Sequence, residues 1–484
     1  MNKLFYGDNL TIMKKMSSES VDLIYLDPPF NSNRSYNLLY KNTTGLPIPE
    51  QIEAFCDTWE LDFEKSELAS DIPRIMQEYG INADTVHFWH YMAEALRMTD
   101  TKLLAYLVYM TVRVIEMYRL LTKSGSLYLH CDPTASHYLK VILDGIFGAK
   151  QIRNEIIWHY KRYTAKSNQF QKLHDVIFWY SKSDEYLFNE LREPYGENSG
   201  KMDSHYKQDE NGQWFRWQKR KGQEPYKIYL SEGRRMGDVW DIPIINASAK
   251  ERLGYPTQKP IALLERIILA SSKEGDVVFD PFCGCGTTIE ASIRNNRQWI
   301  GCDIAIHSIR LIQDTRIKKY ALVEGKDYTI EGIPQSTEQA QYLFEQDPFQ
   351  FQHWSIEKTG GFCSNRKTGD SGIDGRIYFE AENKLCSMVL SVKGGNIKPA
   401  DIRDLRGVLE REPDVEMAGF ISLHEPTKAM VQEADAAGYY EYQGVKYPRI
   451  QLLTINQIFE GKTWYCPSVV KAQRKDGGQT YLNI

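Results

Sequence analysis

The hydrophobic pattern of roughly the first 320 residues alternates short apolar runs with amphipathic stretches of helical period. The apolar runs are long enough for buried strands and lie at 4–6, 21–26, 126–130, 155–158, 175–180, 276–280 and 299–303. Helical spacing of apolar residues recurs between them, at 11–16, 88–118, 135–147 and 261–271. Strands that alternate with helices predict an α/β fold with a mostly parallel, doubly wound sheet.

Acidic residues follow several of these predicted strands. Asp8 follows the first strand, Asp27 ends the second at Asp27-Pro28-Pro29-Phe30, and Asp303 ends the last. Because open α/β sheets bind ligands at the carboxyl ends of their strands, we expect these side chains to face a ligand. Asp8 is also explained as a helix N-cap, and Asp27 as a solvated residue of a Pro-Pro turn.

A glycine-rich turn separates the strand at 276–280 from a following helix. The turn contains Gly284 and Gly286, and the helix starts near Thr287. Glycines let the backbone approach a ligand closely, and a helix N-terminus favours anionic groups. The Gly-x-Gly here is not the full dinucleotide-binding fingerprint, so the turn by itself is weak evidence.

The pattern changes character between about residues 185 and 250. Polar, glycine-rich sequence surrounds a block that mixes aromatic and cationic side chains, namely Trp214, Phe215, Arg216, Trp217, Gln218, Lys219, Arg220 and Lys221. Cations neutralise phosphates, and aromatic rings stack on bases, so the block predicts contact with DNA. A solvated hairpin is the alternative explanation.

Composition narrows the class of protein. A chain of 484 residues with 42% hydrophobic and 25% charged residues predicts a globular protein of two or three domains. The sequence has no apolar run long enough to span a membrane and no signal peptide, so a cytoplasmic protein is expected. The net charge of −5 gives no global signature of nucleic-acid binding, although a local groove can still be basic. Eight scattered cysteines predict reduced thiols and no structural metal.

Taken together, these elements resemble the β-group of amino-methylating DNA methyltransferases. These enzymes transfer a methyl group from S-adenosylmethionine to the exocyclic amine of adenine or cytosine in double-stranded DNA. The resemblance covers roughly residues 1–320 and rests on six elements in the right order, at 7–8, 27–30, 124–132, 255–260, 279–288 and 303. The order, in which the Asp27 element precedes the glycine turn, implies a Rossmann-like fold in the circularly permuted form of that group.

The resemblance implies roles for individual residues. Asp27 and the carbonyl of Pro28, fixed by Pro29, would accept both hydrogens of the target amine, and Phe30 would stack on the flipped base. The cofactor's methionine part would lie among Asp280, Phe282, Gly284, Gly286 and Thr287, beside Thr257 and Lys259; Asp303 would hold the ribose and Asp8 the adenine amine. The 185–250 block would be the target-recognition region, with Trp214, Arg216, Gln218, Lys219 and Arg220 as DNA contacts.

The identity of the target base is predicted from the first residue of the catalytic element. Asp27 resembles the adenine enzymes more than the N4-cytosine enzymes, so we expect N6-adenine methylation, with N4-cytosine as the alternative. Methylation at cytosine carbon-5 needs a cysteine nucleophile within Pro-Cys, a dipeptide that this chain lacks. A non-catalytic DNA-binding protein is a further alternative. Homodimers are common in the family.

The C-terminal part predicts a separate domain over 340–484, after a methyltransferase domain over 1–325. Two of its predicted strands, at 372–377 and 389–393, resemble a restriction-endonuclease-like fold of the Mrr type. In that family a strand-end acid and a following lysine bind Mg²⁺ and activate water. Asp374 and Lys393 fit, Glu357 is a further candidate acid, and Ser391 replaces an expected ligand. A bifunctional restriction–modification enzyme, a degenerate DNA-binding or docking module, which we favour, and an unrelated α/β domain all stay open.

Overall fold

The computed structural model describes residues 2–29, 35–38, 40–41, 52–56, 59–161, 168–194, 205–219, 222, 224–246, 248–255, 257–363, 372–381, 384–412, 415–467 and 473–474. Two predicted site residues, Phe30 and Arg220, lie outside these ranges, so their predicted roles stay predictions.

A nine-stranded sheet forms the centre of the first part of the chain, in the order β14-β7-β8-β6-β2-β15-β16-β1-β17. Strand β8 runs antiparallel to β6 and β7, and the other neighbouring pairs are parallel. This confirms the predicted mostly parallel α/β sheet. The strands are β1 (Asn2–Tyr6), β2 (Val21–Leu26), β6 (Leu121–Cys131), β7 (Ile152–His159), β8 (His174–Ser181), β14 (Val239–Asp241), β15 (Val277–Asp280), β16 (Gln298–Asp303) and β17 (Tyr328–Glu331).

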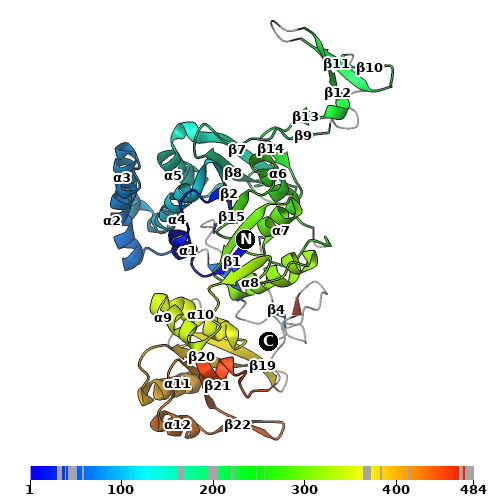
Figure 1. Cartoon of the computed structure of the whole chain (residues 1–484). Helices are drawn as coiled ribbons and strands as arrows, with labels where there is room; N and C mark the ends of the chain where they lie inside the picture. Colours follow the sequence, from blue (N-terminus) through cyan, green and yellow to red (C-terminus); the bar gives the residue numbers. More distant parts are fainter. Residues whose placement is uncertain are drawn as a thin grey trace.

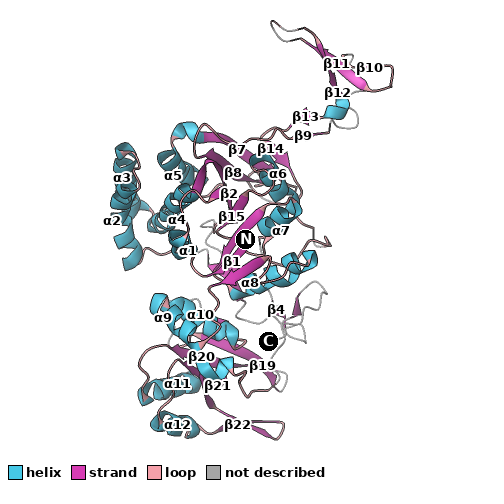
Figure 2. Cartoon of the chain, in the orientation of Figure 1, coloured by secondary structure: helices cyan, strands magenta, loops and turns pink. Residues whose placement is uncertain are grey.

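Helices cover both faces of this sheet (Figure 2). Along β2, Leu23 and Tyr25 belong to one buried cluster, while Ile24 and Leu26 belong to another, as the period of a strand requires. One face packs against α1 (Asn9–Lys15), α4 (Thr101–Leu120) and α5 (Ser136–Phe147), and the other against α6 (Ile261–Ser271) and α7 (Thr287–Arg294). Because both faces are buried, residues 23–26 of β2 form a continuous apolar run.

Strand β17 is not among the strands that the sequence predicted. Its four residues pair in parallel with β1, and the side chain of Asn2 donates a hydrogen bond to the carbonyl of Asp327 (3.1 Å). A four-residue edge strand with one buried side chain, Tyr328, is too short to show a period. The first sheet therefore extends past residue 325.

The predicted helix at 88–118 is also wrong in detail, because it is two helices. Asp100 separates α3 (Ala83–Thr99) from α4 and caps α4 by accepting a hydrogen bond from the Leu103 N–H (3.0 Å). A further helix, α2 (Phe63–Glu78), packs with α3 against α4 at the edge of the molecule (Figure 1). None of the described helices has the length and apolar character needed to cross a membrane.

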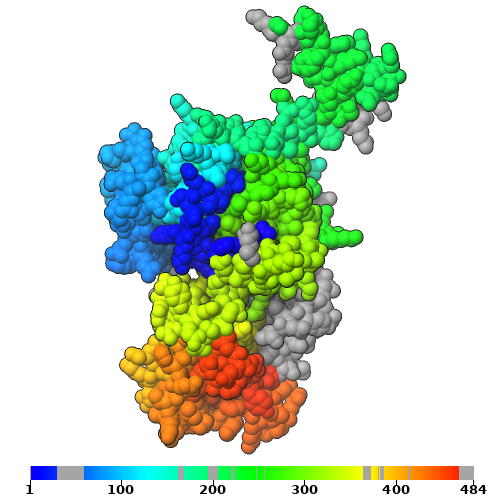
Figure 3. All heavy atoms as spheres, in the orientation of Figure 1, coloured from blue at the N-terminus to red at the C-terminus, as the bar shows by residue number. Residues whose placement is uncertain are grey.

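A small sheet projects from the body at the end of an extended two-stranded connection (Figure 1, Figure 3). The connection pairs β9 (Arg192–Glu193) with β13 (Arg234–Arg235), and the sheet consists of β10 (Lys207–Gln208), β11 (Trp214–Gln218) and β12 (Tyr226–Tyr229). The small sheet and its two-stranded connection fall within the predicted target-recognition block, and together we call them the recognition hairpin.

The C-terminal part contains a second, five-stranded sheet in the order β18-β19-β20-β21-β24. Strands β18 to β20 are antiparallel, and β21 and β24 continue in parallel with β20. Its strands are β18 (Phe362–Cys363), β19 (Gly375–Ala381), β20 (Lys384–Lys393), β21 (Val415–Ser422) and β24 (Ile450–Thr454), with a hairpin of β22 (Tyr439–Tyr442) and β23 (Val445–Pro448). Its helices are α9 (Thr337–Gln346), α10 (Pro348–Lys358), α11 (Pro399–Arg411), α12 (Lys428–Asp435) and α13 (Ile455–Phe459). Short pairs join β3 (Ser35–Leu38) to β5 (Ile52–Cys56) and β4 (Tyr40–Lys41) to β25 (Gln473–Arg474).

The two parts of the chain share a hydrophobic core. Leu4 and Trp299 of the first sheet belong to the same buried cluster as Phe351 and Trp354 of α10. Polar contacts cross the same interface. The Glu357 carboxylate of α10 accepts a hydrogen bond from the backbone N–H of Ile306 (3.1 Å), the first residue of α8 (Ile306–Leu311). Burial raises the pKa of Glu357 to about 8. Helix α10 therefore shares a core with β1 and β16, the two strands that lead to Asp8 and Asp303.

Candidate active site

Four neighbouring parallel strands, β1, β16, β15 and β2, deliver acidic side chains to one edge of the sheet. Asp303 and Asp280 end β16 and β15, Asp27 directly follows β2, and Asp8 lies two residues after β1. All four line a single pocket. Other parts of its wall come from Tyr109, Tyr255, Thr257, Lys259, Phe282 and Thr287. The pocket lies where open α/β sheets bind their ligands, as the sequence predicted.

Asp280 is the most buried of these acids, with 3% of its surface exposed. Its carboxylate accepts hydrogen bonds from the Thr288 hydroxyl (2.5 Å) and the Phe282 N–H (3.0 Å). Burial raises the pKa of Asp280 to about 7, against the opposing effect of these hydrogen bonds. The carboxyl group is therefore close to half protonated at neutral pH, and a cation in the pocket would favour its ionised form.

The glycine turn holds Asp303 through the backbone. The N–H of Gly284 donates to one oxygen of Asp303 (2.9 Å), and the N–H of Ala305 donates to the other (2.9 Å). Loss of contact with bulk water raises the pKa of Asp303 to about 6. Gly286, with a φ of +74°, lies where a Cβ atom would come within 2.7 Å of Ile312. Glycine is therefore required there for both conformation and space.

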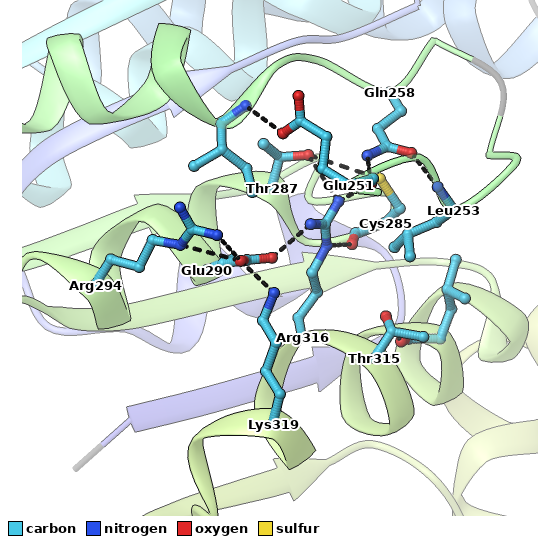
Figure 4. Close-up of polar contacts among 12 residues, drawn as sticks. Glu251, Leu253, Gln258, Cys285, Thr287, Glu290, Arg294, Thr315, Arg316 and Lys319 are labelled. Atoms are coloured by element: carbon cyan, nitrogen blue, oxygen red, sulfur yellow. Dashed lines mark hydrogen bonds and ion pairs between the residues drawn. The ribbon is translucent and has the colours of Figure 1, made fainter. Parts of the chain in front are cut away.

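A buried ion-pair network holds the backbone of the glycine turn in place (Figure 4). Arg316, on the π-helical segment Ile312–Ile317, donates to the carbonyl of Cys285 (3.1 Å) and to the carboxylate of Glu290 (2.5 Å). Arg294 and Lys319 contact the same carboxylate, whose side chain has no exposed surface. The guanidinium thus connects the turn to the helix that follows it.

Asp8 serves two of the roles that the sequence left open. One oxygen caps α1 by accepting a hydrogen bond from the Thr11 N–H (3.0 Å), and the other pairs with Arg113 (2.5 Å). Arg113 lies over the ring of Tyr109 at 3.4 Å and donates to the side chain of Asn9 (2.6 Å). Asp8 is an N-cap that also faces the pocket, in an orientation fixed by Arg113.

Asp27 has one bound and one unbound oxygen. The Lys259 ammonium contacts Oδ2 of Asp27. Oδ1 is buried and accepts no hydrogen bond from any residue that the structure describes. A buried acceptor without a donor is costly, so this oxygen is suited to a donor supplied by a ligand. Pro28 is buried, and Pro29 lines the pocket beside Asp27.

The loop that carries Lys259 has a strained backbone. Thr257 has a φ of +60°, a left-handed conformation that β-branched residues rarely adopt. The side chain of Gln258 fixes the loop by donating to the carbonyl of Glu251 (2.6 Å) and accepting from the Leu253 N–H (2.8 Å; Figure 4). Backbone strain of this kind is concentrated at functional sites, and here it directs Lys259 at Asp27.

A family model described as DNA methylase matches residues 21–314, which is more than half of the chain. The chain belongs to the N6/N4 DNA methylase family. It is 29% identical over 288 residues to the type II methyltransferase M.EcaI of Enterobacter cloacae; the match covers 48% of this chain and 62% of that protein. It is 26% identical over 314 residues to the DNA adenine methyltransferase YhdJ of Escherichia coli strain K12, covering 64% and 80%. The solved PvuII DNA methyltransferase, titled cytosine-N4-specific, shows 14% identity and a TM-score of 0.34 over 63% of this chain and 82% of that one.

The recognition hairpin of this methylase presents part of the predicted aromatic and basic block to solvent. Phe215 is buried inside the small sheet, whereas Trp214 and Trp217 are 36% and 54% exposed. The Lys227 ammonium lies 5.7 Å from the Trp217 ring and 4.5 Å from the Phe215 ring. Arg216 and Gln218 are partly exposed, and Lys219 is exposed. The predicted DNA contacts that the structure describes are therefore accessible.

The next residues to place are those that the sequence predicted for a nuclease site in the C-terminal part. Asp374 precedes β19, and its carboxylate accepts hydrogen bonds from the Gln352 amide (2.9 Å) and the Val392 N–H (2.6 Å). Ser391 is buried, Lys393 is exposed at the end of β20, and Glu357 bonds to α8. No group of three or more His, Cys, Asp or Glu side chains suited to a metal ion occurs among the described residues. Asp374 and Glu357 are therefore already hydrogen-bonded within the protein, and their roles in a Mg²⁺ site stay predictions.

Sequence reasoning missed several side chains that shape the methylase pocket. Arg113 fixes Asp8, Tyr255 and Tyr109 form part of the wall, and Arg316 holds the turn. Arg113 left a signal that could have been used, because it is a single cation within the apolar stretch 103–115. A cation in such a run needs a buried partner. Arg316 lies in a mixed sequence and left no comparable signal.

Proposed function

We propose that this methylase transfers a methyl group from S-adenosylmethionine to the N6 amine of adenine in duplex DNA. The observation that carries the proposal is Oδ1 of Asp27, a buried acceptor without a described donor, at the edge of an acidic pocket. A non-catalytic DNA-binding protein would have no use for an acceptor that is left unsatisfied in this way.

The pocket fits the proposed cofactor. S-adenosylmethionine supplies an electrophilic methyl group on a positively charged sulfur when it is bound. Asp280 and the glycine turn would surround its methionine part, Asp303 would accept from the ribose hydroxyls, and Asp8 from the adenine amine. Two carboxyl groups whose pKa values are raised by burial become ionised most readily beside a cation, which agrees with a positively charged ligand.

Asp27 would activate the target amine. The lone pair of an aromatic amine is delocalised into the ring and is a poor nucleophile. When Oδ1 of Asp27 and the Pro28 carbonyl accept its two hydrogens, the lone pair is directed away from them and becomes available for attack. The base must leave the duplex to reach this point, and a stacking role for Phe30 stays a prediction.

Two observations favour adenine over cytosine as the target. The catalytic element starts with aspartate, as in the adenine enzymes that the sequence resembles. The relative from Escherichia coli strain K12 is named a DNA adenine methyltransferase. N4-cytosine methylation uses the same pocket and stays the alternative.

Nucleoside mass spectrometry tests the proposal. Unmethylated DNA is incubated with the protein and with S-adenosylmethionine labelled in its methyl group, digested and analysed. Labelled N6-methyladenine is the expected product. Labelled N4-methylcytosine would support the proposed pocket but show that the target base is cytosine and not adenine. Unlabelled nucleosides from several unrelated DNAs would favour a protein that binds DNA without methylating it.

We expect cofactor affinity to rise with pH between about 5.5 and 8. Asp280 and Asp303, whose pKa values are about 7 and 6, are largely protonated at the lower end of this range; Asp280 must ionise to lie beside the cofactor's cationic part, and Asp303 must ionise to accept from both ribose hydroxyls. Binding then releases protons, and affinity at pH 5.5 should be lower than at pH 8 by an order of magnitude or more. Calorimetry in buffers of different ionisation enthalpy would count the protons. An affinity that is constant or falls with pH would contradict the assignment, and Asp280→Asn should flatten the dependence.

We propose that the recognition hairpin reads the DNA, through Trp217 and Lys219 on its exposed side. Exposed aromatic rings next to cations suit contact with bases and phosphates. A homodimer also stays a prediction.

For the C-terminal part we propose a DNA-binding or docking role. Asp374 is already bonded by Gln352 and Val392, and Ser391 supplies no charge, so the site favours structure over Mg²⁺-dependent cleavage. Incubating supercoiled plasmid with Mg²⁺ and the full chain should leave it intact. Cleavage that is lost in Asp374→Ala would support the bifunctional alternative instead.

A further inference from the structure

A fully buried histidine lies behind the carboxylate of Asp27. His130, on β6, has no exposed surface. Its Nδ1 lies 4.0 Å from Oδ1 of Asp27, and its Nε2 lies 3.3 Å from Oδ2 of Asp175, on the neighbouring strand β8. A histidine within a core is most often a satisfied packing residue. His130 instead lies between two carboxylates. One is Asp27, whose Oδ1 is proposed to accept a hydrogen bond from the target amine, and the other is Asp175, whose side chain is 17% exposed.

Neighbouring rings fix the orientation of His130. Trp158 packs against it edge-on, with 5.4 Å between ring centroids, and the Tyr25 hydroxyl lies 2.9 Å from Nδ1. Because an ionised Asp175 can only accept, the neutral ring donates from Nε2 to Asp175. Nδ1 is then the acceptor, taking a hydrogen bond from Tyr25. The Nδ1 lone pair is therefore held by Tyr25 at rest, with Oδ1 of Asp27 as the next oxygen at 4.0 Å.

Charged and hydroxyl groups surround His130. The groups that face it are Asp27 and Asp175, the Lys259 ammonium, and the hydroxyls of Tyr25 and Tyr160. Burial alone would raise the pKa of Asp175, but its hydrogen bond to His130, together with the charges of His130 and Lys259, lowers it below the ordinary value. With both carboxylates ionised and Lys259 charged, the group carries one net negative charge. One added proton on His130 makes it neutral.

We propose that His130, oriented by Asp175, takes from Asp27 the proton that the amine loses during methyl transfer. This inference rests on the proposed function. The amine lone pair forms the new N–C bond, and the S–C bond breaks with its electron pair left on sulfur. In the same step an N–H bond breaks, leaving its electron pair on nitrogen, and the proton moves to Oδ1 of Asp27. Asp27 passes the proton to Nδ1 of His130, whose lone pair is released as the Tyr25 hydroxyl turns its hydrogen away, and Asp27 returns to its ionised form.

His130 is better placed for this transfer than the other group on Asp27. The Lys259 ammonium contacts Oδ2 and, while charged, has no lone pair that can accept a proton. His130 faces Oδ1 instead, and its far side leads through Asp175 to the surface. Since His130 acts through Asp27, it is a positioning and proton-accepting residue, and it does not itself touch the base.

Single-turnover rates across pH test the role. The experiment compares three full-length proteins: wild type, His130→Asn and Asp175→Asn. Each is mixed, in excess over the DNA, with a DNA on which the wild type forms labelled product. His137→Asn, which changes an exposed histidine on α5, is the matched control. The His130→Asn rate near pH 7.5 should fall roughly 100-fold, at the lower end of the range for general acid–base catalysis. Cofactor affinity should stay within about twofold in every variant.

The pH profile separates this role from a packing role. With cofactor saturating at every pH, so that the ionisation of Asp280 and Asp303 does not limit binding, the wild-type rate should fall at any pH low enough to place a proton on His130 before the reaction. His130→Asn should lose this acidic limb, and Asp175→Asn, which changes a partly exposed residue, should shift it to lower pH because the imidazolium loses its counter-ion. A slower His130→Asn enzyme that keeps the wild-type profile would overturn the proposal, as would an unchanged rate. A wild-type protein that forms no product would instead overturn the proposed function.

Discussion

Replacing Asp27 with alanine is expected to slow methyl transfer by about 100- to 1,000-fold, while cofactor affinity changes by no more than about twofold. The variant removes the buried acceptor that would bind the amine, a loss comparable in kind to removing one preorganised group from a polar transition-state site. It also removes the carboxylate that the Lys259 ammonium contacts in the wild type, although Lys259 keeps its hydrogen bond to the carbonyl of Thr257. Single-turnover rates with labelled cofactor and calorimetric binding constants would separate the two effects.

The Asp27→Asn variant provides a graded control. Asparagine keeps a carbonyl oxygen that can accept one amine hydrogen, but it loses the charge that pairs with Lys259. We expect its rate to lie between those of the wild type and the alanine variant. An alanine variant that retained more than a tenth of the wild-type rate would show that the amine is activated elsewhere.

The second large effect is expected on stability, from Arg316→Met. The Arg316 guanidinium is 1% exposed, and it bonds Glu290 and the backbone of the glycine turn. Removing one partner of a buried ion pair leaves a buried charge and costs about 3 to 5 kcal/mol of unfolding free energy. We expect about 3 kcal/mol, because Arg294 and Lys319 still contact Glu290. Urea denaturation of the full chain, followed by tryptophan fluorescence, would measure it.

Arg294→Met is the matched control, because Arg294 bonds the same carboxylate but has a side chain that is 41% exposed. Exposed ion pairs contribute about 1 kcal/mol or less, so this variant should unfold close to the wild type. Equal losses in the two variants would mean that burial of Arg316 does not determine the strength of the network.

The sequence predicted the pocket because its acids occupy strand ends. Asp27, Asp280 and Asp303 each end or follow an apolar run, and parallel strands that lie side by side bring such ends together. Residues on the walls were harder to foresee. Arg113 reaches Asp8 from a helix more than a hundred residues away in the sequence. That contact depends on the angle at which the helix packs, and the local hydrophobic pattern does not predict this angle.

Short and interrupted elements account for the errors in the predicted fold. Strand β17 has four residues at a sheet edge, so its pairing with β1 decides its structure more than its own composition does. The break between α3 and α4 follows from one capping side chain, Asp100, inside a region that is helical on both sides. In both places an interaction with a distant or flanking segment overrides the local pattern.

The core shared between α10 and the first sheet has a consequence for any shortened form of this protein. Leu4 and Trp299 share one buried cluster with Phe351 and Trp354, so a chain that ended before α10 would lose part of this cluster and expose apolar side chains of the first part of the chain. Exposed apolar surface of that kind promotes aggregation. A genetic deletion or a proteolytic cut there is therefore expected to lower the yield of folded protein, whatever its effect on the chemistry.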